Sequence, residues 1–82
     1  MKVNASIQSL FEEARSLKSR GEYEKAIEFY QEILKEDPEN YQATRELAQV
    51  YSWNQEYDRS IQYYDKLLSK NPNALRYLLF QR

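Results

Sequence analysis

The chain has 82 residues, 30% of them charged, with a formal net charge of −1, so it makes one domain at most and has no global field that favours nucleic acid or an anionic membrane. It contains no histidine and no cysteine, which excludes Ser-His and Cys-His catalysis, His-ligated metal sites and disulfides. A single glycine leaves no phosphate-binding loop, and no apolar run approaches the roughly 20 residues that cross a bilayer, so we expect no enzyme, no cofactor, no metal and no membrane insertion.

The first half of the chain predicts two helices. Apolar residues recur at steps of three or four along residues 4–19, which is the period of one helix face; they are Ile7, Leu10, Phe11, Ala14 and Leu17. Gly21 can adopt a positive φ at little cost, so we expect it to close this helix at its C-terminal end. A second stripe begins at Tyr23 and predicts a helix over 23–36, and Pro38 ends it.

The second half repeats the first with an offset of 34 residues. GEYEKAIEFYQEILKEDP at 21–38 returns as QEYDRSIQYYDKLLSKNP at 55–72, and 7–40 aligns with 41–74 without a gap. Identical pairs are Gln8/Gln42, Glu12/Glu46, Ala14/Ala48, Glu22/Glu56, Tyr23/Tyr57, Ile27/Ile61, Tyr30/Tyr64, Leu34/Leu68 and Pro38/Pro72. The pattern predicts further helices over 41–53, 57–70 and 74–81. Because the second unit lacks the glycine, we expect Asn54 to take the left-handed region and the turn to shift by one residue.

A physical reason for the repetition is that one helix pair cannot bury its apolar face alone, whereas a second pair stacked on it can. Small residues at Ala14 and Ala26, and at Ala48 and Ser60 in the second unit, allow the two helices of each pair to approach closely. We therefore expect an all-α fold of about five antiparallel helices in one domain over 1–82. Its parts are a first repeat at 7–40, a second at 41–74 and a C-terminal helix at 74–82.

These residues resemble the tetratricopeptide repeat family. The 34-residue period, the small residue in the first helix, the turn glycine, Tyr-x-x-Ala-Ile at the start of the second helix and the closing Asp-Pro are all present in 7–40. The second copy keeps the register but has Gln55 for Gly and Ser60 for Ala, and 75–82 looks like the opening of a third unit. The resemblance implies a right-handed α-α superhelix, a solenoid whose first helices line a concave face that binds proteins or peptides.

On that implied concave face the candidate peptide-binding residues are Phe11, Arg15, Lys18, Arg45, Gln49, Trp53 and Arg76. Acidic residues mostly follow the second helix of the first unit, so we expect the concave face to be basic and its partner to have acidic or aromatic character. The plainer interpretation is an ordinary scatter of charge. Trp53 has two interpretations as well: packing against the neighbouring helix, or a flat aromatic anchor for a partner.

One subfamily grips the C-terminal carboxylate of cytosolic chaperones with Lys and Asn on its first helices. This chain has Phe11 and Arg15 at matching positions and Glu46 in place of a further Asn, so we do not expect that clamp. The eight tyrosines also raise the possibility of nucleic-acid stacking. However, Tyr23, Tyr30, Tyr57 and Tyr64 fall on the apolar stripes, so we expect them in the core.

The alternative function is a structural one, a scaffold that self-associates or one fragment of a longer repeat protein. The end of the chain, NALRYLLFQR, is apolar nearly all round, and Leu75, Tyr77, Leu78, Leu79 and Phe80 are the candidates for self-association into a homo-oligomer. The chain as given is expected to be soluble and cytoplasmic. A periplasmic location is the alternative if it belongs to a longer bacterial protein, because LAQVYSWNQEYDRSI is similar to repeats in bacterial periplasmic and outer-membrane export proteins.

Overall fold

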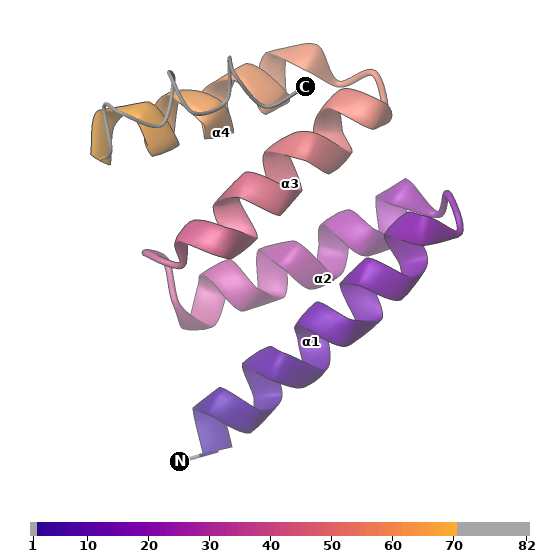
Figure 1. The fold of residues 1–82 in the computed structure, drawn as a ribbon, viewed down its shortest axis with the longest axis vertical. Helices are drawn as coiled ribbons and strands as arrows, with labels where there is room; N and C mark the ends of the chain where they lie inside the picture. Colours follow the sequence, from indigo (N-terminus) through magenta and orange to yellow (C-terminus); the bar gives the residue numbers. More distant parts are fainter. Residues whose placement is uncertain (1, 71–82) are drawn as a thin grey trace.

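The computed structural model describes residues 2–70, with side chains from Ile7 to Ser69. This part of the chain forms four helices: α1 (Lys2–Ser19), α2 (Tyr23–Glu36), α3 (Tyr41–Trp53) and α4 (Tyr57–Lys70) (Figure 1). The bounds expected for α2, α3 and α4 are confirmed, and α1 starts at Lys2 rather than at residue 4. The fifth expected helix, over 74–81, lies outside the described residues.

The turn inside the first repeat, between α1 and α2, and the turn inside the second, between α3 and α4, are built in the same way. At the end of α1, the Glu22 N–H donates to the Leu17 carbonyl at 2.9 Å, the Gly21 N–H donates to the Lys18 carbonyl at 3.1 Å, and Gly21 has a φ of 80°. At the end of α3, Glu56 donates to Tyr51 at 2.8 Å and Gln55 to Ser52 at 3.0 Å. This pair of bonds is the Schellman arrangement, which needs a positive φ at the first residue beyond the cap.

The expected shift of the second turn to Asn54 is therefore wrong. Asn54 has a φ of −88°, and Gln55, which stands in register with Gly21, takes the positive φ of 65°. The reason is that the hydrogen-bond pattern fixes which position must be left-handed, whatever side chain stands there. The chemical preference of asparagine for that region is too small to move the turn.

The link between the repeats is stabilised by a side-chain cap. Asn40 precedes α3, and its Oδ1 accepts a hydrogen bond from the Ala43 N–H at 2.8 Å, while the Thr44 hydroxyl donates to the Asn40 carbonyl at 2.9 Å. Asparagine is among the preferred residues at this position because its side chain satisfies a helix N–H that has no partner within the helix. The cap, together with Pro38, sets where α2 ends and α3 begins.

The four helices form a row in which each packs on its neighbour in the chain. Figure 1 shows this order from α1 to α4. The core between them contains the fully buried side chains of Tyr30, Ile33, Leu47 and Val50, and nearly all of Tyr51. The small residues lie where expected: Ala14, Ala26 and Ala48 have no exposed surface, and the Ser60 hydroxyl donates to the Ala48 carbonyl at 2.9 Å.

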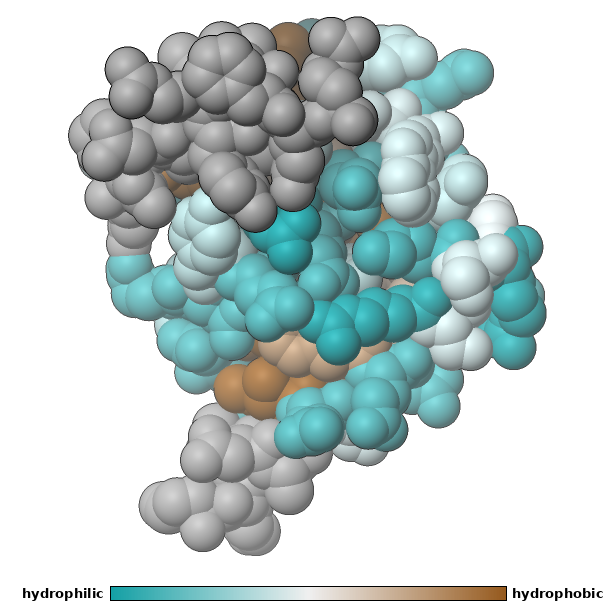
Figure 2. Space-filling view, viewed as in Figure 1, coloured by the Kyte–Doolittle hydropathy of each residue, from teal (hydrophilic) through white to brown (hydrophobic). Residues whose placement is uncertain are grey.

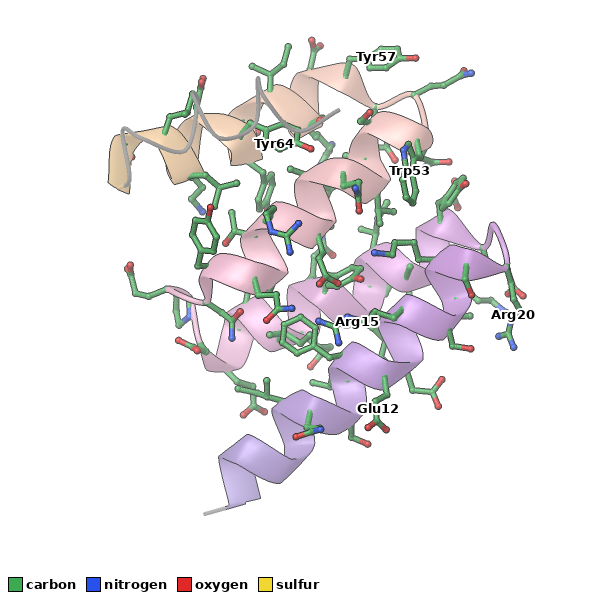
Figure 3. The ribbon with its side chains drawn as sticks, in the orientation of Figure 1. Glu12, Arg15, Arg20, Trp53, Tyr57 and Tyr64 are labelled. Atoms are coloured by element: carbon green, nitrogen blue, oxygen red, sulfur yellow. The ribbon has the colours of Figure 1, made fainter. Side chains whose placement is uncertain are left out.

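The tyrosines on the stripes do not all reach the core. Tyr30 is fully buried and Tyr23 and Tyr64 are half-buried, as their spacing suggests, but Tyr57 is 59% exposed. The expectation that Tyr57 belongs to the core is thus wrong. Among the described helices, α2 packs against both α1 and α3, whereas α4 packs against α3. Figure 3 shows Tyr57 pointing outward from the start of α4.

Candidate functional site

Side chains of α1 and α3 meet in space although these helices are not neighbours in the chain. The Arg15 guanidinium donates to the Glu46 carboxylate from Nε at 3.1 Å and from Nη2 at 2.9 Å, and Lys18 Nζ donates to Gln49 Oε1 at 3.5 Å. The two first helices therefore share one surface, which we call the α1–α3 face. Its residues are Gln8, Phe11, Arg15 and Lys18 on α1 and Gln42, Arg45, Glu46, Gln49 and Trp53 on α3.

Glu46 is the centre of a polar network on this face. It is only 5% exposed, and besides Arg15 it accepts hydrogen bonds from the Tyr30 hydroxyl at 2.6 Å and from Gln42 Nε2 at 3.3 Å. Lys18 Nζ lies 3.8 Å from its Oε1. A buried carboxylate is stable only when it is paired and hydrogen-bonded, and no buried polar side-chain atom among the described residues lacks a partner.

The network holds Glu46 in its ionised form. Burial by itself raises the pKa of this carboxyl, but hydrogen bonds from Arg15 and Tyr30 and the charges of Lys18 and Arg15 outweigh burial and lower the pKa to about 2. Its partners shift in the complementary direction. The hydrogen bond that Arg15 donates to Glu46 raises the pKa of Arg15. Burial, and next the hydrogen bond that Tyr30 donates to Glu46, raise the pKa of the Tyr30 hydroxyl.

The equivalent residue in the first repeat behaves differently. Glu12 stands in register with Glu46 but is exposed, and Figure 3 shows it on α1 with its carboxylate turned outward. The difference arises because Glu46 faces the Arg15 side chain of the preceding first helix, whereas α1 has no such helix before it among the described residues. Burial of this glutamate thus depends on the contact between repeats.

A hollow of about 570 Å³ lies on the α1–α3 face, beside the N-terminal half of α1 and the start of α3. Its lining consists of Ile7, Gln8, Phe11, Glu12, Arg15 and Gln42, and Figure 2 shows hydrophobic surface over the N-terminal part of α1. The Arg15 guanidinium lies 4.7 Å from the centre of the Phe11 ring, and Phe11 meets Tyr30 edge-on at 6.2 Å. The hollow is therefore lined by two apolar side chains together with amide and charged groups.

Trp53 packs against a neighbouring helix, as the first of its two interpretations expects, while its role as an anchor for a partner stays a prediction. Its ring packs against Tyr23, with ring centres 6.0 Å apart and planes inclined by 50°, and Lys18 Nζ lies 5.8 Å from its centre. Nevertheless 48% of the residue's surface remains exposed. Figure 3 shows Trp53 at the end of α3, on the side facing the start of α2. A tryptophan that is held by its neighbours and still half exposed is well suited to contact a partner.

The structure brings six of the seven candidate peptide-binding residues onto one face, and Arg76 lies outside the described residues. The charge of that face is more balanced than its basic residues suggest, because Arg15 and Lys18 both pair with Glu46. Arg45 forms no ion pair within the described part of the chain. The candidate self-association residues Leu75, Tyr77, Leu78, Leu79 and Phe80 also lie outside the described residues.

Glu46 is the residue that the sequence interpretation missed as a structural centre. A signal existed: Glu46 stands 31 residues after Arg15, three short of the repeat period, which places the two side chains within one turn of each other on successive first helices. Elsewhere, the described residues contain no cluster of three or more carboxylates placed to hold a metal ion. None of the described helices has both the length and the apolar character needed to cross a membrane.

Comparison with known families adds to this geometry. A family model described as tetratricopeptide repeat matches residues 17–81, and a comparison with curated proteins finds no match. The matched region covers most of the chain and includes the turns, the closing prolines and the α1–α3 contacts from Lys18 onward. Repeats of this family are in general protein–protein interaction modules. With its 34-residue period and its row of packed helix pairs, the chain belongs to the tetratricopeptide repeat family.

Proposed function

We propose that this chain is a non-catalytic interaction module that binds a peptide or a protein segment on the α1–α3 face, the concave face of the family. The observation that supports this most is the half-exposed Trp53 on a face whose helices are joined by the Glu46 hydrogen bonds to Arg15 and Tyr30. Aromatic side chains on a pre-ordered surface provide a large share of binding energy, because little conformational entropy is lost when the partner arrives.

The charges of the face bear on the partner's character. Arg15 and Lys18 share the single negative charge of Glu46, and Arg45 is the cation on this face with no ion pair among the described residues. An acidic residue of the partner would give Arg45 a counter-charge, and Arg76 would extend the same basic side. We therefore propose a partner segment that has at least one acidic residue together with apolar or aromatic side chains for the Phe11 hollow and Trp53.

Calorimetric titration with a small peptide panel tests this function. Acidic peptides should bind more tightly than basic peptides of the same length, and added salt should weaken them through screening. Arg45→Glu should reduce the affinity for acidic peptides, whereas Lys25→Glu, on an exposed position of α2 outside the face, should leave it unchanged. A preference for basic peptides, or equal binding by Arg45→Glu, contradicts the proposed partner.

A second candidate function is self-assembly, as a scaffold or as one section of a longer repeat protein. It is favoured by the exposure of Tyr57 and Ile61 on α4, at 59% and 58%, since exposed large apolar side chains in a row mark an interface. In this proposal residues 75–80 mediate the contact between copies. Sedimentation over a range of concentrations tests it: a strict monomer, with Tyr77→Asp and Phe80→Asp leaving stability and solubility unchanged, counts against self-assembly.

A further inference from the structure

The exposed side of α4 repeats the side of α2 that contacts α3. On α2, the Tyr23 ring packs against Trp53 with ring centres 6.0 Å apart, and the Tyr30 hydroxyl donates to Glu46 at 2.6 Å. Ile27 stands between these two tyrosines on the same side of the helix and is 8% exposed. The equivalents on α4, 34 residues later, are Tyr57, Ile61 and Tyr64. Helix α4 thus presents the kind of side that α3 covers on α2.

The side of α3 that packs on α2 is apolar apart from Glu46. Ala43, Leu47 and Val50 have no exposed surface and belong to the core cluster that includes residues of α2. They recur at steps of four and three residues, so they lie on one side of α3 together with Glu46. A helix that covers a side of the α2 type therefore offers small or branched apolar side chains.

Helix α1 carries polar residues at these positions. The equivalents of Ala43, Leu47 and Val50, 34 residues earlier, are Ser9, Glu13 and Ser16. All three are exposed, and so is Glu12, the equivalent of Glu46. We call Ser9, Glu12, Glu13 and Ser16 the outer face of α1. Figure 1 shows α1 and α4 at opposite ends of the row of described helices, so this face and the exposed side of α4 are the two ends of that row.

Packing of α4 from a second copy onto the outer face of α1 would bury a carboxylate. In an arrangement like that of α2 on α3, Glu13 would take the place of Leu47, which has no exposed surface. The cations of α4 would not reach it, because their α2 equivalents stay exposed with α3 in place; these cations are Arg59, Lys66 and Lys70. A buried carboxylate without a partner is strongly unfavourable.

Glu12 would be less well held than Glu46. The cations that pair with Glu46 are Arg15 and Lys18, and their equivalents in the second repeat are the neutral Gln49 and Ser52. The contact between the two repeats of this chain is thus not reproduced when one copy is placed before another.

We propose that the outer face of α1 is a closed end, which prevents copies of this chain from stacking head to tail with α4 of one copy on α1 of the next. Head-to-tail stacking would generate an open-ended filament, whereas two copies that meet through their α4 sides form a contact that closes at a dimer. The inference goes beyond the proposed function. It also holds for a monomer, so it does not depend on the self-assembly given above as the second candidate.

Sedimentation of the full chain over a range of concentrations tests this with a variant that gives α1 the residues of α3. The triple variant Ser9→Ala, Glu13→Leu, Ser16→Val should show an average mass that rises with concentration beyond that of two chains. The parent should not exceed two chains at any concentration. Ile61→Asp, added to the triple variant, removes the α4 side of the contact and should return the mass to that of the parent.

A matched control places the same three residue types on exposed positions elsewhere. Lys25→Ala, Glu28→Leu, Glu32→Val puts them on one side of α2, makes the net charge more positive by one as the loss of Glu13 does, and should sediment as the parent. Far-UV circular dichroism checks that both triple variants are folded. Glu13→Leu alone is the milder second variant and should raise the mass in the same direction.

Four results overturn the closed end. They are a parent whose mass keeps rising past two chains, folded Glu13→Leu and triple variants that sediment as the parent, an increase in mass that Ile61→Asp does not reverse, and an equal increase in the control. Peptide titrations do not enter this test, so the interaction module stands or fails separately.

Discussion

Glu46 is the residue through which three helices are connected. It belongs to α3, accepts the Tyr30 hydroxyl from α2 and is held by the Arg15 guanidinium from α1. Tyr30 is fully buried, so its hydroxyl depends on this one acceptor, whereas the Arg15 side chain is 43% exposed and can turn to water. The network therefore stabilises the contact between repeats mainly by satisfying a buried phenol and a buried carboxylate.

Replacing Glu46 should be costly. Glu46→Ala leaves the Tyr30 hydroxyl buried without an acceptor and removes the partner of Arg15, so we expect the free energy of unfolding to fall by about 2–3 kcal/mol. Urea denaturation measures this. The control is Glu12→Ala at the exposed equivalent position, which should change stability by less than about 0.5 kcal/mol. Similar losses for the two variants would mean that the Glu46 contacts contribute nothing in solution.

Lowering the pH should remove the stabilisation that the ionised Glu46 carboxylate provides. The pKa of Glu46 is lowered from its ordinary 4.5 to about 2, so the ionised carboxylate stabilises the folded state above pH 4.5, and this stabilisation is lost as pH falls toward 2. The difference corresponds to about 3 kcal/mol. Because other carboxylates also titrate in this range, we expect the unfolding free energy of the parent to fall more steeply than that of Glu46→Gln. Parallel pH profiles for the two proteins contradict the assignment.

At the residue scale the sequence predicted which side chains share a face better than it predicted their environment. Repeat register placed Arg15 and Trp53 on the same face because equivalent positions of stacked helices point the same way. Burial of a charged residue such as Glu46 depends on the relative heights of three helices, which apolar spacing does not specify. The prediction that Tyr57 lies in the core was wrong for a related reason. Apolar spacing indicates that one face of a helix is apolar, but it does not indicate that another helix covers that face.

At the scale of single elements, the two turns test how far position outweighs residue preference. Gly21 and Gln55 have φ values of 80° and 65° in turns with the same pair of hydrogen bonds. Glycine adopts this region freely, whereas a residue with a Cβ pays about 1–2 kcal/mol there. The second turn thus retains the geometry of the first with a less suitable residue.

Gln55→Gly should therefore stabilise the protein. Relief of the left-handed backbone is partly offset by the greater entropy of glycine in the unfolded chain, so we expect a gain of about 0.5–1 kcal/mol. Gly21→Ala should lower the free energy of unfolding by a similar amount. An added Cβ there meets no atom within 4 Å, so this loss measures the cost of the left-handed backbone without a steric clash. Thermal melts of both variants give the two signs. A loss of stability in Gln55→Gly would show that the Gln55 side chain has a role of its own.

The helix bounds were the most predictable feature of the fold. Period, turn glycine and proline located α2, α3 and α4 to the residue, because these signals act within a few residues of one another. The left-handed residue of the second turn was missed because asparagine's preference was given more weight than the repeat register. Where local preference and register disagree in a repeat protein, the hydrogen-bond pattern copied from the neighbouring repeat is the better guide.

At the scale of the whole molecule, the second helices of the two repeats differ in how many of the described helices pack against them. Ile27 on α2 is 8% exposed, while Ile61, its equivalent on α4, is 58% exposed. The same side chain is thus core in one repeat and surface in the other, because α2 packs on both α1 and α3. In a row of repeats, stability depends on contacts between neighbours as well as within each helix pair.

This asymmetry predicts different costs for the same substitution. Ile27→Ala opens a cavity between helices and should lower the free energy of unfolding by about 2–4 kcal/mol, whereas Ile61→Ala removes an exposed side chain and should cost less than about 1 kcal/mol. Urea denaturation at low protein concentration gives both values, and repeating it at high concentration with sedimentation shows whether a second copy covers α4. If Ile61→Ala costs as much as Ile27→Ala in the monomer, the apolar stripe of α4 is buried in solution by the chain itself, and the exposure of Tyr57 and Ile61 no longer supports an interface.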